Sequence, residues 1–362
     1  MIARAMRKPA GLPQLVALAA ILFANWLAFP GFFDLTVQDG RLYGSLIDVL
    51  NRGAPVAILA IGMTLVIASG GIDLSVGAVM ALAGAVAAVL IDAGHPLWLV
   101  LAGALAAGLV CGLWNGILVA VLDIQPIVAT LILMVAGRGI AQLVTEGTIA
   151  TFVDDGLIFI GSGSVLGLPM PVIITAGLAL IAILLVRRTA LGLFIEAIGI
   201  NRRASLHAGI GSRLVIVSVY MASGFCAAVA GVIIAADIRG ADANNAGLWL
   251  ELDAILAVVI GGTSLLGGRF SVLMSLLGAL IIQAMNTGIL MSGYPPEFNF
   301  IFKAAIIVVI LVMQSPLAAR LGRRWLGGRG RPGSAARPGA ATRASAAARP
   351  GVTRPESQEV RP

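Results

Sequence analysis

The chain has 362 residues, of which 59% are hydrophobic and 11% are charged, and its mean hydropathy is +1.01. Charged residues make up about 25% of a typical soluble domain, so this composition excludes a soluble protein and places most of the chain in a lipid bilayer. The net charge of +7 arises at the C-terminus, because residues 318–362 carry ten arginines and two glutamates. Residues 1–317 carry fourteen basic and fifteen acidic side chains, a balance of −1.

Apolar stretches predict an all-α, polytopic membrane protein with about ten transmembrane helices, because a helix of about 20 mostly apolar residues spans a bilayer. The first stretch follows the basic segment MIARAMRK. It is longer than the roughly 7–15 apolar residues of a cleaved signal peptide, which predicts a retained span. The predicted spans are residues 12–30, 54–69, 75–92, 97–122, 127–144, 170–186, 213–235, 252–268, 271–291 and 300–317.

Basic residues predict that both termini are cytoplasmic, because cytoplasmic loops carry an excess of lysine and arginine. A basic cluster precedes the first span, a second follows the sixth span, and a third follows the tenth. The clusters are Arg4, Arg7 and Lys8; Arg187, Arg188, Arg202, Arg203 and Arg213; and Arg320, Arg323 and Arg324. We therefore predict a transmembrane domain in residues 1–317, with a cytoplasmic loop at 187–212.

Residues 318–362 are rich in arginine, proline, alanine and glycine and contain few large apolar residues. Such a segment cannot bury a core, so we predict a disordered, basic cytoplasmic tail. Contact with anionic membrane lipid is the favoured role of this tail, and contact with nucleic acid is the weaker alternative.

Motifs for catalysis are absent from the sequence. Neither lysine follows a Gly-x-x-x-x-Gly, so there is no phosphate-binding loop, and the chain has only two histidines, His95 and His207. Cys111 and Cys226 lie in apolar runs and are predicted to be packing residues. We therefore expect a protein that is not an enzyme, with no catalytic residue, no metal site and no cofactor.

The segment SGGIDLSVG, from Ser69 to Gly77, places Asp73 between two apolar spans. One interpretation is local: glycines end one helix, and Asp73 or Ser75 caps the next. The other is a broken helix on a transport path, where exposed backbone groups face water or substrate. A second glycine break, GGTSLLGGR at 261–269, has the same two interpretations.

Four further polar residues lie in or beside apolar spans, where polar groups usually face the interior of a helical bundle. Together with Asp73, the candidates for a translocation path are Asn115, Gln125, Arg138 and Asn286. Hydrogen bonding between helices is the alternative for the two asparagines, and pairing with a nearby carbonyl or acid is the alternative for Arg138. No carboxylate lies near the middle of a long span, which disfavours a proton-coupled carrier.

A polar insert, TALGLFIEAIGINRRASLHAGIG at 189–211, interrupts the apolar sequence on the predicted cytoplasmic side. Its mixture of apolar and polar residues predicts a short helix along the membrane surface, and its glycines permit a close backbone approach or a sharp turn. We interpret this insert as a docking surface for a cytoplasmic partner. The candidate coupling residues are Glu196, Gly199, Asn201, Arg202 and Gly209.

Four stretches resemble the permease subunits of bacterial ribose-type ABC sugar importers. They are the polar insert at 189–211, GGIDLSVG at 70–77, IQPIVATLILMVAGRG at 124–139 and ELDAILAVVIGGTSLLGGR at 251–269. The resemblance covers about residues 15–314, and IIAADIRGADANNAGLWLELDAILAVVIGG at 233–262 is similar to the galactofuranose branch of this family. It implies a type II-like importer permease in the bacterial inner membrane.

The resemblance also implies three partners: a cytoplasmic ATPase on the 187–212 loop, a periplasmic sugar-binding protein, and a second permease subunit that is identical or related. A polar outer loop at 236–247 is placed to meet the binding protein, although an ordinary solvated loop is the alternative. Its contact candidates are Arg239, Asp242, Asn244 and Asn245. The alternative function is an ATP-independent carrier for a small polar solute.

Overall fold

The computed structural model describes residues 11–38, 40–293, 295 and 297–314. By internal contacts the chain divides into residues 1–310 and residues 311–362. Of the second unit only residues 311–314 are described, as the end of a helix. The predicted basic tail, 318–362, therefore lies outside the described residues.

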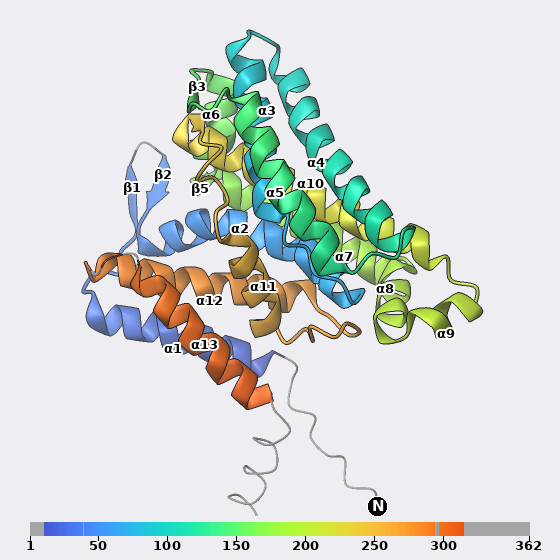
Figure 1. The fold of residues 1–362 in the computed structure, drawn as a ribbon. Helices are drawn as coiled ribbons and strands as arrows, with labels where there is room; N and C mark the ends of the chain where they lie inside the picture. Colours follow the sequence, from blue (N-terminus) through green and yellow to red (C-terminus); the bar gives the residue numbers. More distant parts are fainter. Residues whose placement is uncertain (1–10, 39, 294, 296, 315–362) are drawn as a thin grey trace, which may run out of the picture. The chain divides into compact units, whose positions relative to one another are not determined.

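Helices dominate the described residues (Figure 1). In chain order they are α1 (Leu12–Ala28), α2 (Ser45–Ala68), α3 (Val76–Asp92), α4 (Leu97–Ala120), α5 (Pro126–Val144), α6 (Asp155–Ser162), α7 (Met170–Arg188), α8 (Leu191–Ile200), α9 (Arg202–His207), α10 (Ser212–Ile238), α11 (Leu250–Ile260), α12 (Val272–Met291) and α13 (Phe298–Gln314). Six short strands form three antiparallel pairs. The pairs are β1 (Thr36–Gln38) with β2 (Arg41–Tyr43), β3 (Ala150–Thr151) with β6 (Gly240–Ala241), and β4 (Ser164–Val165) with β5 (Leu168–Pro169).

The helix connections gather at two opposite ends of the helical bundle. At one, the hairpin end, Leu42 N of β2 donates to Gly167 O in the turn between β4 and β5 over 3.0 Å. At the other, the α8 end, the backbone NH of Gly268 donates to Ala68 O over 2.9 Å. Helices α8 and α9 also lie at this second end. Arg202, the first residue of α9, binds Asp123 in the connection between α4 and α5, which lies there too.

The core forms around α10, which packs against α2, α3 and α4 (Figure 1). Glycines at spacings of four residues, Gly108, Gly112 and Gly116, line the face of α4 toward α10. A Cβ atom at Gly108 would collide with Gly224 O, and one at Gly112 with Tyr220 O. Small residues at this spacing let two helix backbones approach closely, which drives helix association in a bilayer.

Each of the ten predicted spans overlaps a helix, but the predicted number of membrane crossings is not confirmed. Among the described residues, six helices are long and apolar enough to cross a membrane. These are α2, α4, α5, α7, α10 and α12. The predicted span at 252–268 is wrong in extent, because α11 has 11 residues and is about 16 Å long.

Glycines explain why α11 ends early. Gly262 has φ of +88°, a left-handed conformation that terminates a helix. A Cβ atom at Gly261 would lie 2.7 Å from Ser275 N, so the chain can pass α12 at this position only as glycine. The second predicted span also differs, because α2 begins at Ser45 and carries the polar residues Asp48 and Asn51 in its first turns.

Two non-helical stretches lie against the first turn of α3, one directly before α3 and one before α11. In the first, Leu74 N donates to the hydroxyl of Thr130, one turn into α5, over 3.2 Å. The second connects β6 to α11 (Figure 1) and approaches α3 so closely that a Cβ atom at Gly247 would lie 2.5 Å from Gly77 O. The two stretches therefore meet near the first turn of α3.

Candidate functional site

The polar insert forms two short helices, α8 and α9, where the sequence predicts one short helix along the surface. Asn201 separates them and caps α9, because its side-chain oxygen accepts from Ala204 N over 3.0 Å. Ile195 and Ile198 are buried against the bundle, whereas Leu193 and Ile200 are 68% and 73% exposed. One apolar face of the segment thus packs against the bundle. A second apolar surface, which contains Leu193 and Ile200, is covered by no described residue.

Gly199 forms a backbone junction between three elements at the α8 end. A Cβ atom there would collide with Ala68 O at the end of α2 and would lie 2.6 Å from Gly268 N. Gly267 approaches the same point, since its Cβ would lie 2.9 Å from Gly199 O. The predicted close backbone approach at Gly199 is confirmed, and Gly209, with φ of +83°, forms the predicted turn after α9.

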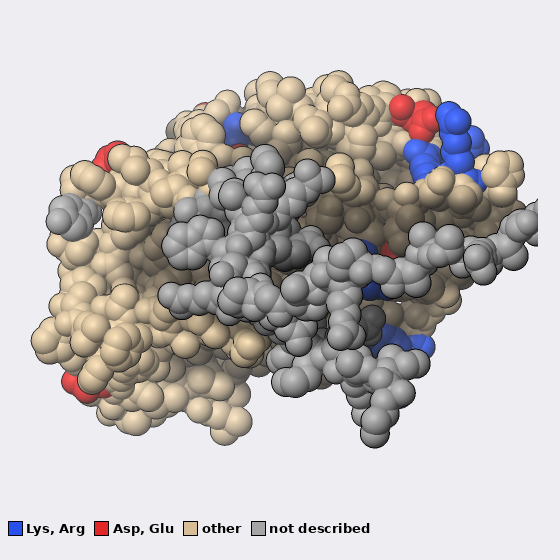
Figure 2. Space-filling view, turned by 90° about the horizontal axis from the view of Figure 1, so that it is seen from below, with Lys and Arg blue, Asp and Glu red and all other residues tan. Residues whose placement is uncertain are grey.

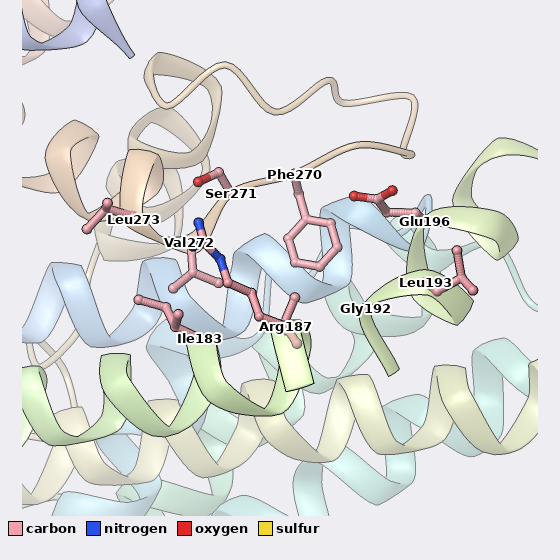
Figure 3. A pocket seen from close by; sticks show the side chains of 10 residues that line it. Ile183, Arg187, Gly192, Leu193, Glu196, Phe270, Ser271, Val272 and Leu273 are labelled. Carbon is pink, nitrogen blue, oxygen red and sulfur yellow. The ribbon is translucent and has the colours of Figure 1, made fainter. Parts of the chain in front are cut away.

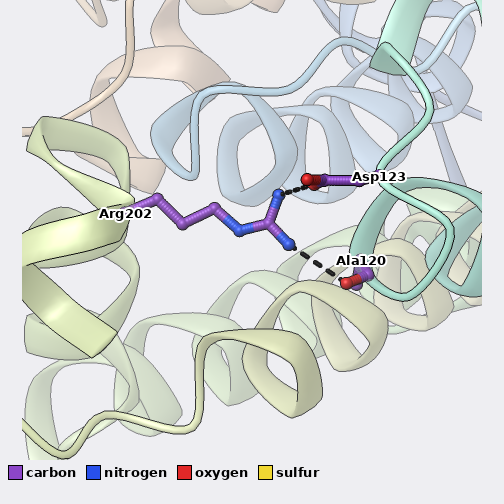
Figure 4. A network of polar contacts seen from close by, with 3 residues as sticks. All are labelled: Ala120, Asp123 and Arg202. Atoms are coloured by element: carbon purple, nitrogen blue, oxygen red, sulfur yellow. Dashed lines mark hydrogen bonds and ion pairs between the residues drawn. The ribbon is translucent and has the colours of Figure 1, made fainter. Parts of the chain in front are cut away.

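Arg202 ties α9 to the connection between α4 and α5 (Figure 4). Its Nη1 donates to Asp123 Oδ1 over 2.7 Å, and its Nη2 donates to Ala120 O over 3.0 Å. The second bond satisfies a carbonyl at the C-terminus of α4, where the helix lacks an internal donor. Asp123 has φ of +59°, an unusual conformation for a residue other than glycine.

The Arg202–Asp123 pair is expected to contribute little to stability. Its side chains are 36% and 79% exposed, and exposed ion pairs typically contribute less than about 1 kcal/mol. We expect Asp123→Asn to change the thermal unfolding midpoint in detergent by no more than about 3 °C. A larger loss would show that the pair is needed for folding rather than for positioning α9.

A pocket of about 350 Å³ opens between α7, α8 and the start of α12 (Figure 3). Arg187 at the end of α7 and Glu196 on α8 line opposite parts of it, and Phe270 and Ser271 line it from the connection before α12. Glu196 is half-buried at this rim. The pocket is therefore a concave surface of mixed polarity, next to the exposed apolar residues of α8.

A buried polar cluster joins α3, α4 and α10. Asp73 Oδ1 accepts from Ser75 N over 3.0 Å and from Ser75 Oγ over 2.6 Å, and Asp73 Oδ2 accepts from Ser223 Oγ over 2.8 Å. Asn115 Nδ2 donates to Ser75 Oγ over 2.8 Å. All four residues are almost completely buried, so the cluster fixes the stretch before α3 against two other helices.

These contacts test the prediction that glycines end α2 and that Asp73 or Ser75 caps α3. Gly70, with φ of +86°, ends α2 as predicted. Asp73 accepts from Ser75 N, at the start of the predicted span, but neither Asp73 nor Ser75 accepts from an amide of α3 itself, which begins at Val76. The structure also brings Asp73 and Asn115 together, although the sequence places them 42 residues apart.

Arg138 binds the backbone before α11 rather than an acidic side chain. Its Nη1 donates to Ala243 O over 3.0 Å and to Ala246 O over 2.6 Å. The next turn of α5 adds Gln142, whose Nε2 donates to Asn244 Oδ1 over 2.6 Å. The expected alternative for Arg138, pairing with a nearby carbonyl, is thus what the structure contains.

The remaining candidates are separated from one another. Gln125 is exposed just before α5 at the α8 end and lines a pocket of about 220 Å³ with Arg202 and Tyr220. Asn286 lies on α12, and its buried Oδ1 has no hydrogen-bond partner among the described residues. Arg239 is exposed at the hairpin end, directly after α10. The path candidates therefore do not form one cluster in a single copy of the chain.

Sequence reasoning missed two buried polar contacts. Ser223 lies in a long apolar run, and only its pairing with Asp73 reveals its importance. Lys303 of α13 forms an ion pair with buried Asp253 of α11, with 2.7 Å between Nζ and Oδ1. A signal for the second contact existed, because Lys303 is the only lysine within a predicted span. Cys111 and Cys226 are free and buried, as predicted.

Charged side chains are sparse on the face shown in Figure 2 and gather in small groups. The largest group, which contains both signs, lies on the side where Figure 1 places α8 and α9. The α8 end also carries the Arg202–Asp123 ion pair and the neighbouring Arg203. The α8 end thus offers a partner both exposed apolar side chains and charges.

Known proteins similar to this chain include several sugar permeases. The galactofuranose transporter permease protein YtfT of Escherichia coli K12 is 63% identical over 312 residues, which cover 86% of this chain and 92% of the relative. The fructose import permease protein FruF of Bifidobacterium longum is 44% identical over 295 residues (79% and 83%). The ribose import permease protein RbsC of E. coli K12 is 36% identical over 306 residues (83% and 92%).

No solved structure matches the chain. The family model described as the permease component of branched-chain amino acid transport systems matches residues 45–311, from the first residue of α2 into α13. This match covers well over half of the sequence. The chain therefore belongs to this family of transport permeases and is a transport subunit rather than an enzyme.

Proposed function

We propose that the chain is the membrane-spanning permease subunit of an ATP-driven ABC importer that moves galactofuranose into the cytoplasm. The observation that carries this proposal is the 63% identity to a galactofuranose transporter permease over most of both chains. The fructose and ribose import permeases among the relatives favour an importer over an ATP-independent carrier. ATP hydrolysis belongs to a separate subunit, because this sequence has no phosphate-binding loop.

The α8 end is the cytoplasmic side in this proposal, and the membrane is the bacterial inner membrane. Arg187, Arg188 and Arg203 all lie at this end, as the excess of basic residues in cytoplasmic loops requires. The same orientation places the strand pairs of the hairpin end outside. Arg239, exposed at that end, is a contact for a periplasmic sugar-binding protein.

The segment α8–α9 is the docking site of the cytoplasmic ATPase. Its exposed Leu193 and Ile200 supply apolar contacts, and Glu196 lines the adjacent pocket. Closure of the ATPase dimer moves α8, and the junction at Gly199 passes this movement to α2 and to the connection before α12. A second permease subunit, identical or related, completes the path, which the described residues of one copy do not enclose.

A charge reversal at Glu196 tests this docking site. We expect Glu196→Arg to reduce ATP-driven uptake at least about tenfold, because it places a second cation near Arg187 on the surface that meets the ATPase. Membrane insertion is expected to be unchanged, since Glu196 is half-buried and no described residue donates a side-chain hydrogen bond to it. Uptake and membrane abundance are measured together, and normal uptake in the variant contradicts the docking site.

Co-purification tests the proposed assembly. The chain is solubilised gently from its native membranes with a tag after Pro362, and the proteins that accompany it are identified by mass spectrometry. We expect an ATPase and a second permease subunit in stoichiometric amounts. Recovery of the chain alone, repeated after crosslinking, contradicts an importer complex and supports a self-contained carrier.

A further inference from the structure

A polar surface forms where the connection before α11 lies against α5. It consists of Arg138 and Gln142 on α5 and of Asp242, Asn244 and Asn245 on the connection, and is called the α5 polar surface below. Asp242 organises it, because its Oδ1 accepts from Asn244 N over 3.0 Å and from Asn245 N over 3.1 Å, and its Oδ2 accepts from Asn245 Nδ2 over 2.7 Å. The surface is thus built from several interlocking contacts.

Exposed apolar residues flank this surface on α5. Arg138 lies twelve residues after the first residue of α5, about 18 Å along the helix axis, and six residues before its end. Leu131 and Val135 on one side are 45% and 66% exposed, and Leu143 on the other side is 79% exposed. Because such residues require lipid or protein around them, the α5 polar surface lies at the depth of the membrane.

The backbone at this depth is not helical. Two carbonyls of the connection, those of Ala243 and Ala246, are satisfied by Arg138. Non-helical backbone at membrane depth is tolerated where protein buries it or where it lines a water-filled cavity. Asn244 and Asn245 are exposed in the single chain. Because polar side chains at membrane depth face protein or water rather than lipid, this surface faces a partner subunit or an aqueous cavity.

From this placement we propose that the α5 polar surface lines the route of the sugar and forms hydrogen bonds with the hydroxyl groups of the passing monosaccharide. This inference rests on the proposed function. Amide groups both donate to and accept from hydroxyls, and a carboxylate accepts from them, which is the chemistry that a polyhydroxylated solute requires. It assigns Asp242, Asn244 and Asn245 to the sugar route rather than to contact with the binding protein.

Accessibility gives the first test, in proteoliposomes that contain the complete complex. Asn245→Cys is treated with a charged, membrane-impermeant thiol reagent, and the unaltered chain supplies the background because Cys111 and Cys226 are buried. Ile132→Cys, on α5 and 51% exposed among apolar residues, is the matched control. We expect Asn245→Cys to react at least about tenfold faster than Ile132→Cys. Equal and slow reaction of both overturns a water-filled route at this surface.

Transport gives the second test, with three readouts on Asn245→Leu. We expect the rate of sugar uptake to fall about fivefold or more, while ATPase stimulation by the sugar-loaded binding protein stays within about twofold and the complex remains assembled. Asn245→Gln, which keeps an amide, is expected to recover most of the uptake. Loss of ATPase stimulation assigns the residue to the binding-protein contact, and loss of assembly assigns it to the contact between permeases; either outcome overturns the inference.

The unaltered complex distinguishes a failure of the proposed function from a failure of the inference about the α5 polar surface. If it takes up no monosaccharide with ATP, the proposed function itself fails. If it takes up sugar and Asn245→Leu does so equally well, the proposed function stands and the inference about the α5 polar surface is overturned.

Discussion

Gly199→Ala is expected to reduce ATP-driven uptake at least about tenfold while the chain still inserts and folds. Gly199 lies in the last turn of α8, and its φ is not in the left-handed region. Alanine is favoured over glycine by roughly 0.5–1 kcal/mol in a helix interior, so local helix propensity alone predicts a small gain in stability. The close contacts of Gly199 in the structure nevertheless predict a loss of ATP-driven uptake.

The reason is the three-way backbone junction at Gly199. An added methyl group would collide with Ala68 O and with Gly268 N, so α8 must move away from the end of α2. Backbone atoms cannot turn aside as a flexible side chain can, and overpacking of this kind typically costs about 1–3 kcal/mol. Displacement of α8 breaks the contact that passes movement of the ATPase to the permease helices.

Gly211→Ala is the matched control for this variant. Gly211 lies at the same end of the bundle, also has a negative φ, and has no atom within 4 Å of an added Cβ. Uptake by Gly211→Ala is expected to stay within about twofold of the unaltered chain. Normal uptake and normal ATPase coupling in Gly199→Ala would contradict the role of the junction.

Asp73→Ala is expected to be the most destabilising single change in the buried polar cluster. It removes the acceptor for Ser75 N, Ser75 Oγ and Ser223 Oγ at a completely buried site. Each buried donor left without a partner costs about 1–3 kcal/mol. We expect a loss of about 2–5 kcal/mol and a fall in the unfolding midpoint in detergent of at least about 5 °C.

Asp73→Asn separates hydrogen bonding from charge at this position. The amide keeps one acceptor oxygen for Ser75, and the hydroxyl of Ser223 can rotate to accept from the new NH₂ group. We therefore expect Asp73→Asn to retain at least half of the stability that Asp73→Ala loses. Equal losses in the two variants, measured by size-exclusion chromatography after heating, would show that the carboxylate charge matters more than its hydrogen bonds.

Local patterns predicted the helices and the segment α8–α9 well. Apolar stretches identify helices because a backbone in lipid must form its own hydrogen bonds. The polar residues around Asn201 identified the surface segment without any information on tertiary contacts. The caps and turns there follow from residue type, since Asn201 accepts from Ala204 N and Gly209 adopts a positive φ. These features depend on neighbours in sequence, so sequence reasoning could reach them.

Contacts between distant segments could not be predicted in the same way. Hydropathy extended the predicted span to residue 268, although the predicted glycine break at 261–269 marks the point where α11 ends; the close approach of Gly261 to α12 could not be predicted. The partner of Asp73 on α10 is 150 residues away. Arg138 could be identified as unusual, but its carbonyl partners 105 and 108 residues later could not.

ATP-dependent uptake by the complete complex in proteoliposomes is the most direct measurement of the proposed function. The purified permease, its ATPase and its binding protein are reconstituted, and entry of labelled galactofuranose is followed with ATP, with a non-hydrolysable ATP analogue, and with an ion gradient alone. We expect accumulation with ATP and none in the other two conditions. Accumulation driven by the ion gradient without ATP would contradict an ABC importer and identify a secondary carrier.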